Sequence, residues 1–220
     1  MNKEVNSDSV SILASRIEYH LMDTRCGSMI GAFGLYSDDA VKAALQRIKT
    51  PHVYIDIGVS YNIREDIFVR LAAAFDRKLT NYPCVREDIK SRIIRGVQNL
   101  STHSRDYRDP MNFGQLVTEL RRDEIFKELL IAIKELEHAN NNEKVLISIE
   151  VDWNGLDYRF LQTLYNLINE NKDVVFIVNV LLPIETQILM LSRKYEECGE
   201  NIINKYFSYS DIINCDPDIE

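Results

Sequence analysis

The chain has 220 residues, of which 45% are hydrophobic and 27% are charged, so its composition excludes a disordered or a fibrous protein. Its formal net charge of −8 excludes a global basic field that would attract nucleic acid or an anionic membrane surface, and leaves only local patches for such contacts. A chain of this length is expected to build one core, so we take residues 1–220 as a single domain.

The cysteines and the N-terminus bear on the cellular compartment. The four cysteines lie far apart and form no C-x-x-C pair, which favours reduced structural thiols over zinc ligands. The opening segment "MNKEVNSDSV" lacks the basic-then-apolar order of a signal peptide, and no apolar run reaches the roughly 18–20 residues of a membrane span. We therefore expect a cytoplasmic protein that does not contact a membrane.

The first predicted element is an amphipathic helix, in which apolar residues recur at helical spacing. These residues are Val10, Leu13, Ile17 and Leu21. A short strand, "SMIGAF" at 28–33, is predicted next. The stretch "GAFGLYSDDAVKAAL" at 31–45 then has the layout of a phosphate-binding loop that runs into a helix, with glycines at Gly31 and Gly34.

Three further segments are predicted as buried strands because they are short, β-branched and nearly continuous in apolar residues. They are 52–59 ("HVYIDIGV"), 144–151 ("KVLISIEV") and 173–180 ("DVVFIVNV"). Continuous apolarity indicates that helices cover both faces of the sheet, which is typical of parallel strands. A weak fifth strand is predicted at 205–211 ("KYFSYSD").

Helices are predicted between these strands. A capping pattern of Asn62 and Glu65 begins one helix, and residues 85–138 carry two or more others as a helical insertion. Another helix crosses over at 155–171, and Pro183 starts a helix at its first position. With right-handed crossovers, this order predicts an α/β fold: a three-layer sandwich with a mostly parallel five-stranded sheet and the insertion between strands 2 and 3.

The order of elements resembles the P-loop ATPases of the AAA+ and STAND kind, especially the archaeal ATPases related to origin-binding proteins, over roughly residues 10–212. "GAFGLYSD" looks like the Walker A loop, "LISIEV" looks like Walker B, and "VVFIVNV" places Asn179 like the sensor residue. The resemblance implies a P-loop NTPase-like fold. The chain ends soon after "KYFSYSD", so we expect no C-terminal lid or winged-helix module.

The departures from this family fall on the residues that carry its chemistry. In the pattern G-x-x-x-x-G-K-[ST], Tyr36 replaces the second glycine, Ser37 the lysine and Asp38 the hydroxyl that binds magnesium. The lysine brings a positive charge to the phosphates, and neutral Ser37 removes it. Glu150 stands at the position of the metal-binding acid and Val151 at that of the catalytic glutamate. We therefore expect an inactive ATPase that binds neither ATP nor Mg²⁺.

The same loop also has a purely structural interpretation. Ser37 is a natural N-cap, and Asp38 and Asp39 in the first turn favour the helix dipole by ~0.3–1 kcal/mol each. The acids then stand where a phosphate would, and supply its negative charge to the helix. The alternative is a loop that binds a nucleotide by an unusual route.

A metal site is the rival hypothesis. Asp56, Glu150 and Asp152 lie at or near the ends of predicted strands, where acids can hold a divalent metal for phosphodiester cleavage. A restriction-like nuclease usually adds a lysine two residues after one acid, and neither "YIDIGV" nor "SIEVDW" has one. Acids at strand ends also arise as cap and turn residues, which is the structural alternative.

Residues 86–122 carry a local excess of basic charge, and four arginines of this segment are candidates for a nucleic-acid-binding patch. These are Arg92, Arg95, Arg105 and Arg108. The alternative is a solvated helical face. Because the catalytic residues of the ATPases are replaced, the resemblance implies a binding or regulatory subunit, which would contact a protein partner or copies of itself as the related ATPases do. A metal-dependent nuclease or phosphohydrolase remains the second hypothesis.

Overall fold

A computed structural model describes residues 7–23, 25–60, 87, 143–151 and 156–216 of the chain. These residues form a sheet of five strands in the order β2-β3-β4-β1-β5, and every pairing between neighbouring strands is parallel. The strands are β1 (Ser28–Phe33), β2 (Val53–Ser60), β3 (Val145–Val151), β4 (Val174–Val180) and β5 (Ile212–Asn214).

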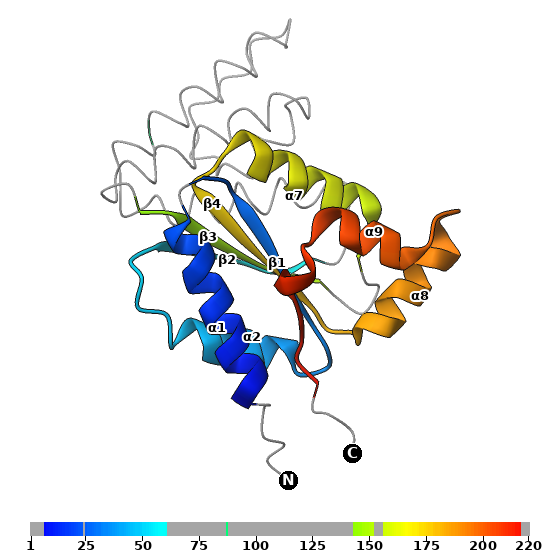
Figure 1. The fold of residues 1–220 in the computed structure, drawn as a ribbon, viewed down its shortest axis with the longest axis horizontal. Helices are drawn as coiled ribbons and strands as arrows, with labels where there is room; N and C mark the ends of the chain where they lie inside the picture. The colour runs from blue at the N-terminus through cyan, green and yellow to red at the C-terminus, as the bar shows by residue number, and fades with distance from the viewer. Residues whose placement is uncertain (1–6, 24, 61–86, 88–142, 152–155, 217–220) are drawn as a thin grey trace, which may run out of the picture.

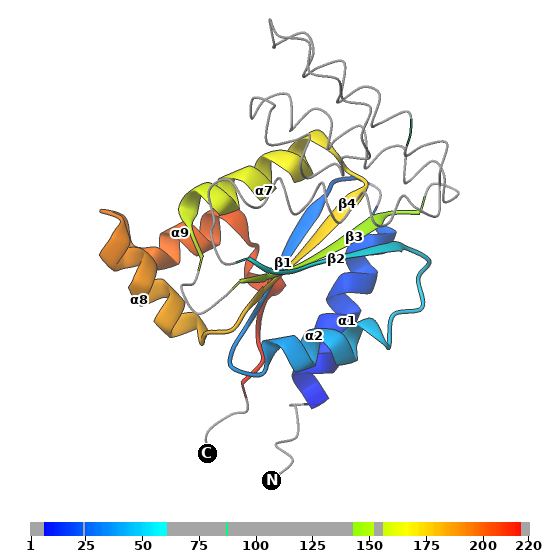
Figure 2. The same cartoon turned by 180° about the vertical axis from the view of Figure 1, so that it is seen from behind.

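Helices cover both faces of this sheet, and Figures 1 and 2 show the layers from opposite sides. One face carries α1 (Ser7–Met22) and α2 (Ser37–Leu45), and the other carries α7 (Tyr158–Glu170), α8 (Ile184–Lys194) and α9 (Gly199–Tyr206). The predicted α/β fold, a three-layer sandwich around a parallel five-stranded sheet, is therefore confirmed.

The central strand β4 shows why its sequence is continuously apolar. All of its residues are buried. Val175 and Ile177 belong to the core cluster that includes α1 and α2, whereas Phe176 and Val178 belong to the cluster that includes α7 and α9. Because side chains alternate across a strand, a strand between two helical layers buries apolar residues in both directions.

The predictions for the helices agree in type and differ at some ends. The apolar stripe of α1 is buried, as predicted, at Val10, Leu13, Ile17 and Leu21. Helix α8 begins at Ile184, and Pro183 is its N-cap and not its first residue. The helix predicted from Asn62 and, apart from Glu87, the helical insertion predicted at 85–138 lie outside the described residues.

The prediction of the fifth strand at 205–211 is wrong. This segment forms the end of α9 and a 3-10 turn, η1, at Tyr209–Asp211. Helix α9 has one buried stripe, formed by Ile202, Ile203 and Tyr206. Burial of this stripe favours helix as far as Tyr206. The fifth strand, β5, follows η1 and pairs with β1 over a run too short to stand out in the sequence.

The strand order creates a point where the crossovers diverge. β1 leads into α2 on one face of the sheet, whereas its neighbour β4 leads into α8 on the other face. In open parallel sheets, ligands bind outside the carboxyl ends of the strands at such a switch point. The topology therefore predicts that a ligand site, if present, lies at the carboxyl ends of β1 and β4.

Candidate functional site

The connection between β1 and α2 consists only of Gly34, Leu35 and Tyr36. Gly34 has a φ of 132°, which residues with a side chain rarely adopt, and a Cβ there would lie 2.7 Å from the carboxylate of Asp216. Its N–H donates to the carbonyl oxygen of Val180 at 3.1 Å, and so ties the loop to the end of β4. Both the backbone conformation and the available space therefore require glycine at this position.

Gly31, the first glycine of the predicted loop, lies inside β1 and pairs with Val178 and Ile212. A Cβ on Gly31 would lie 2.5 Å from the ring of Phe33 and 3.2 Å from the ring of Phe207. These two rings meet edge to face, with their centroids 6.1 Å apart. Gly31 therefore makes room for an aromatic pair in the core, and the loop itself begins at Gly34.

Backbone donors at Leu35 and Ser37 bind oxygens of the chain itself. The N–H of Leu35 donates to the carboxylate of Asp216 at 2.6 Å, and the N–H of Ser37 donates to the carbonyl of Gly34 at 3.1 Å. The Ser37 hydroxyl is fully buried and donates to the carbonyl of Val180 at 3.0 Å. Ser37 thus anchors α2 to β4, and the N-cap position that the sequence predicted for it belongs to Tyr36.

Acidic side chains surround the start of α2. Asp38 and Asp39 lie in its first turn, where the N–H groups of the helix favour negative charge. Lys42 forms an i,i+4 ion pair with Asp38. The hydrogen bond to Asp38, followed by the charges of Asp38, Asp39 and Glu150, raises the pKa of Lys42. This ammonium group is therefore already held by an acid of its own helix.

Polar residues line the face of the sheet that α2 covers, near the carboxyl ends of the strands. Asp56 of β2 pairs with Ser148 of β3, and Glu150 of β3 pairs with Asn179 of β4. Ile177, two residues before Asn179, belongs to the core cluster on the α1 and α2 side, so Asn179 points to the same side. Glu150 and Asn179 consequently lie side by side, with Asn179 on a strand of the switch point.

Glu150 is a half-buried carboxylate that makes no hydrogen bond or ion pair with any residue that the structure describes. Burial raises the pKa of Glu150, and the charges of Asp38 and Asp56 raise it further, while Lys42 acts in the opposite direction. The ionised form of Glu150 is therefore poorly stabilised by its surroundings.

Asn179 is 2% exposed, and its Oδ1 has no hydrogen-bond partner within the described part of the chain. Buried polar atoms are nearly always bonded, and an acceptor left alone costs ~1–3 kcal/mol. Among the residues described, three other buried atoms share this condition, but none of them lies on this face near the carboxyl ends. They are Ser28 Oγ, Asn171 Nδ2 and Gln187 Nε2.

Not every predicted site residue can be placed. Asp152, and with it the third acid of the predicted metal site, lies outside the described residues, as do the four arginines of the basic segment. The charge of Asp56 is close enough to Glu150 to raise the pKa of Glu150. Among the residues described, no group of three or more His, Cys, Asp or Glu side chains is arranged to hold a metal ion.

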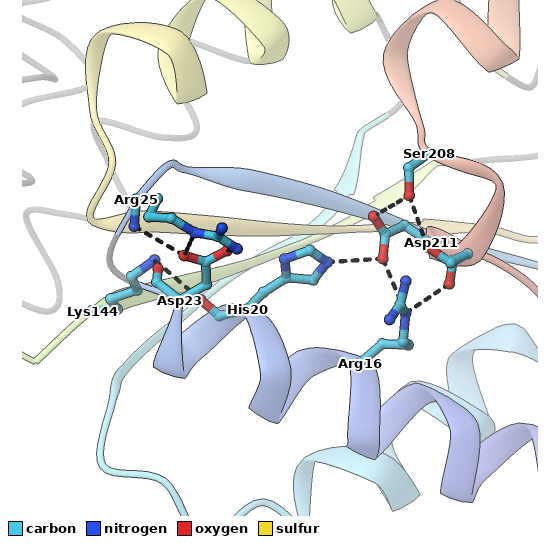
Figure 3. A network of polar contacts seen from close by, with 8 residues as sticks. Arg16, His20, Asp23, Arg25, Lys144, Ser208 and Asp211 are labelled. Atoms are coloured by element: carbon cyan, nitrogen blue, oxygen red, sulfur yellow. Dashed lines mark hydrogen bonds and ion pairs between the residues drawn. The ribbon is translucent and has the colours of Figure 1, made fainter.

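One polar network was not anticipated from the sequence, and Figure 3 shows it between α1 and the C-terminal segment. His20 is 8% exposed, and its Nε2 lies 2.8 Å from Oδ1 of Asp211. Arg16 Nε lies 3.2 Å from the same oxygen, and Ser208 donates to the other oxygen at 2.6 Å. The only signal in the sequence was the place of His20, three residues after Ile17 on the apolar stripe of the first helix.

A buried lysine donates hydrogen bonds to backbone carbonyl groups at the C-terminal end of α1 (Figure 3). Lys144 is 7% exposed and its ammonium donates to the carbonyl oxygens of His20 at 3.0 Å and Cys26 at 3.2 Å, and also to that of Asp23. A cation at the C-terminus of a helix satisfies carbonyls that have no partner inside the helix. We assign Lys144 a structural role on this basis.

Comparisons with known proteins add no family to this picture. No model of a protein family matches the chain, and no curated protein matches it at a significant level. The described part of the chain also has no helix with the length and apolarity needed to cross a membrane.

Proposed function

We propose that this protein is a catalytically inactive, P-loop ATPase-like domain that serves as a binding or regulatory subunit. The observation that supports it best is the bond from the Leu35 N–H to the carboxylate of Asp216. In a phosphate-binding loop the backbone N–H groups cradle phosphate oxygens. Here a carboxylate of the chain itself occupies a donor of the loop, while the N–H of Gly34 is bonded to Val180.

The charges near the loop support the same proposal. A triphosphate at the start of α2 would meet the carboxylates of Asp38, Asp39 and Asp216, and the nearby ammonium of Lys42 is paired with Asp38. Two like charges about 4 Å apart repel by ~1 kcal/mol in water and by ~4 kcal/mol near a protein surface. Since the lysine of the Walker A pattern is also replaced, we expect no binding of ATP with Mg²⁺.

The binding role itself comes from the resemblance. The related ATPases assemble with copies of themselves or with partners through faces beside the nucleotide site. A member that lost the nucleotide can keep such a face, because the sheet and its two helical layers bury their apolar residues against one another. Analytical sedimentation over a range of protein concentrations tests self-association. If the protein is monomeric at every concentration, self-association is excluded and the partner would be a different protein.

The experiment that tests the nucleotide claim is thermal unfolding with and without Mg-ATP. A ligand at 100 times its dissociation constant stabilises a protein by ~2.7 kcal/mol, which for a chain of this size raises Tm by about 5–10 °C. We expect no such rise for the wild type or for Asp216→Ala, in which the N–H of Leu35 is released but Asp38 and Asp39 remain. A clear rise in the wild type would overturn the proposal. A rise in Asp216→Ala alone would mean that the carboxylate covers a working site.

Unfolding with Mn²⁺ alone tests the second hypothesis, the metal-dependent nuclease or phosphohydrolase. The observation in its favour is that Asp56 and Glu150 face the same side of the sheet and interact electrostatically. A Mn²⁺-dependent rise in Tm that is lost in Glu150→Ala would favour that hypothesis over an inactive domain.

A further inference from the structure

We propose that the pair formed by Glu150 and Asn179 binds an arginine side chain of a partner protein. This inference rests on the proposed function, because it supplies the chemistry by which an ATPase-like domain without a nucleotide would recognise its partner. It assigns a cation to the place where the family resemblance would expect an anion.

Both side chains offer hydrogen-bond acceptors. Among the described residues, the carboxylate of Glu150 makes no hydrogen bond, and the buried acceptor Oδ1 of Asn179 has no partner. An acceptor gains nothing from a phosphate oxygen, which is also an acceptor. It gains from an N–H donor, of which a guanidinium presents five.

The spacing of the two side chains suits a guanidinium group. Glu150 and Asn179 are register partners on adjacent parallel strands, and neighbouring strands lie ~4.7–4.9 Å apart. A guanidinium carries its N–H groups in a planar fork that can reach two acceptors at once, whereas the ammonium of lysine is a compact point charge. Glu150 is partly exposed, so a side chain arriving from solvent would meet it first and bring a donor beside the buried oxygen of Asn179.

The charge around Glu150 is mostly negative. The carboxylates of Asp38 and Asp56 act on Glu150, and the one ammonium that acts on it, that of Lys42, is already paired with Asp38. Such a field attracts a cationic side chain and repels an anionic ligand. A divalent metal is the less suitable cation, because no group of three metal-binding side chains was found in the described portion of the chain.

The test is a titration of the full-length, ¹⁵N-labelled protein with a blocked Gly-Arg-Gly peptide, followed by NMR. We expect saturable shifts at residues 148–151 and 178–180 and at the side-chain amide of Asn179. A Gly-Lys-Gly peptide should bind at least fivefold more weakly, and binding of the arginine peptide should weaken as NaCl is raised from about 50 to 300 mM. Shifts elsewhere, or equal binding of the lysine peptide, would overturn the inference.

Two variants and one control connect the binding to these side chains. Glu150→Gln keeps the shape but removes the charge, and we expect at least a tenfold loss of affinity. Asn179→Leu should also lose affinity while remaining at least as stable as the wild type, which separates binding from folding. Glu185→Gln removes an exposed acid of α8 on the opposite face and should bind like the wild type. An equal loss in Glu150→Gln and Glu185→Gln would reduce the effect to net charge, and an unchanged affinity in Asn179→Leu would exclude Asn179; either result would refute a specific site.

Parallel titration with Mg-ATP separates this inference from the proposed function. If ATP binds, the proposed function fails whatever the peptide does. If neither ATP nor the arginine peptide binds, the inactive domain stands and the arginine site is refuted.

Discussion

Asp211 joins α1 to the C-terminal segment, and its replacement by asparagine gives a prediction whose size follows from its contacts (Figure 3). The side chain is nearly buried, accepts a hydrogen bond from Ser208 and lies within contact distance of His20 and Arg16. Hydrogen bonds to a charged group are worth ~1.5–3 kcal/mol each, but the amide keeps one acceptor oxygen. We therefore expect Asp211→Asn to lower the free energy of unfolding by about 2–4 kcal/mol at pH 7.

The pH dependence of this loss makes the prediction sharper. Burial alone would raise the pKa of Asp211, but the hydrogen bonds from His20 and Ser208, with the charges of His20 and Arg16, outweigh it and lower this pKa. A carboxylate with a depressed folded pKa contributes stability above its unfolded pKa of ~3.9 and loses it as the pH falls through the folded value. The wild type should therefore lose this contribution below about pH 4, and the gap to Asp211→Asn should narrow there.

Urea unfolding monitored by circular dichroism at pH 7, 5, 4 and 3.5 measures the gap directly. The control is Glu196→Gln, an exposed acid, which should change the free energy by no more than about 0.5 kcal/mol at neutral pH. The reasoning fails if Asp211→Asn is as stable as the wild type at pH 7, or if the gap stays constant down to pH 3.5.

Three further substitutions test the assignment of single groups. Asn179→Leu removes a buried oxygen that has no hydrogen-bond partner among the described residues, so we expect the free energy of unfolding in urea to rise by about 1 kcal/mol; a fall of that size would show that the amide is satisfied. Lys144→Met leaves the carbonyl groups at the end of α1 without their donor, and should cost about 3 kcal/mol or more, against no measurable change for the exposed Lys172→Met. Gly34→Ala forces a side chain into a positive φ and against a carboxylate, so we expect a loss of about 2 kcal/mol or more and a lower Tm; an unchanged Tm would contradict the geometry of the loop.

The fold was accessible from the sequence wherever a local pattern decides the structure. The buried residues Leu13 and Ile17 lie four positions apart, which places them on one face of a helix, so the helix can be predicted from the local sequence alone. The continuous apolarity of 173–180 marks a central strand because both of its faces are covered. In contrast, β5 is short and is a strand because it pairs with β1, which lies about 180 residues earlier. No pattern in the local sequence reveals this pairing.

The candidate site depended on contacts that no local pattern contains. Ser37 has the residue type of an N-cap, but its hydroxyl is directed to the carbonyl of Val180, 143 residues away. The partner of the Leu35 N–H, Asp216, lies 181 residues away. Glu150 and Asn179 were each noticed for a different reason, and their pairing follows only from the order of the strands. The sequence therefore indicates single residues of the site, but the residues that they contact are known only from the fold.

The two proposals describe one change in the chemistry of the same edge of the sheet. A loop that binds phosphate must keep its N–H donors open and its surroundings positive. In this chain the N–H groups of Gly34 and Leu35 are bonded to the protein, whereas the acceptors of Glu150 and Asn179 have no donor among the described residues. Loss of nucleotide binding and gain of a site for a cationic side chain would then share one physical origin. A substitution that places a donor beside Asn179 should accordingly weaken the binding of the arginine peptide without creating affinity for ATP, because the N–H groups of Gly34 and Leu35 stay bonded.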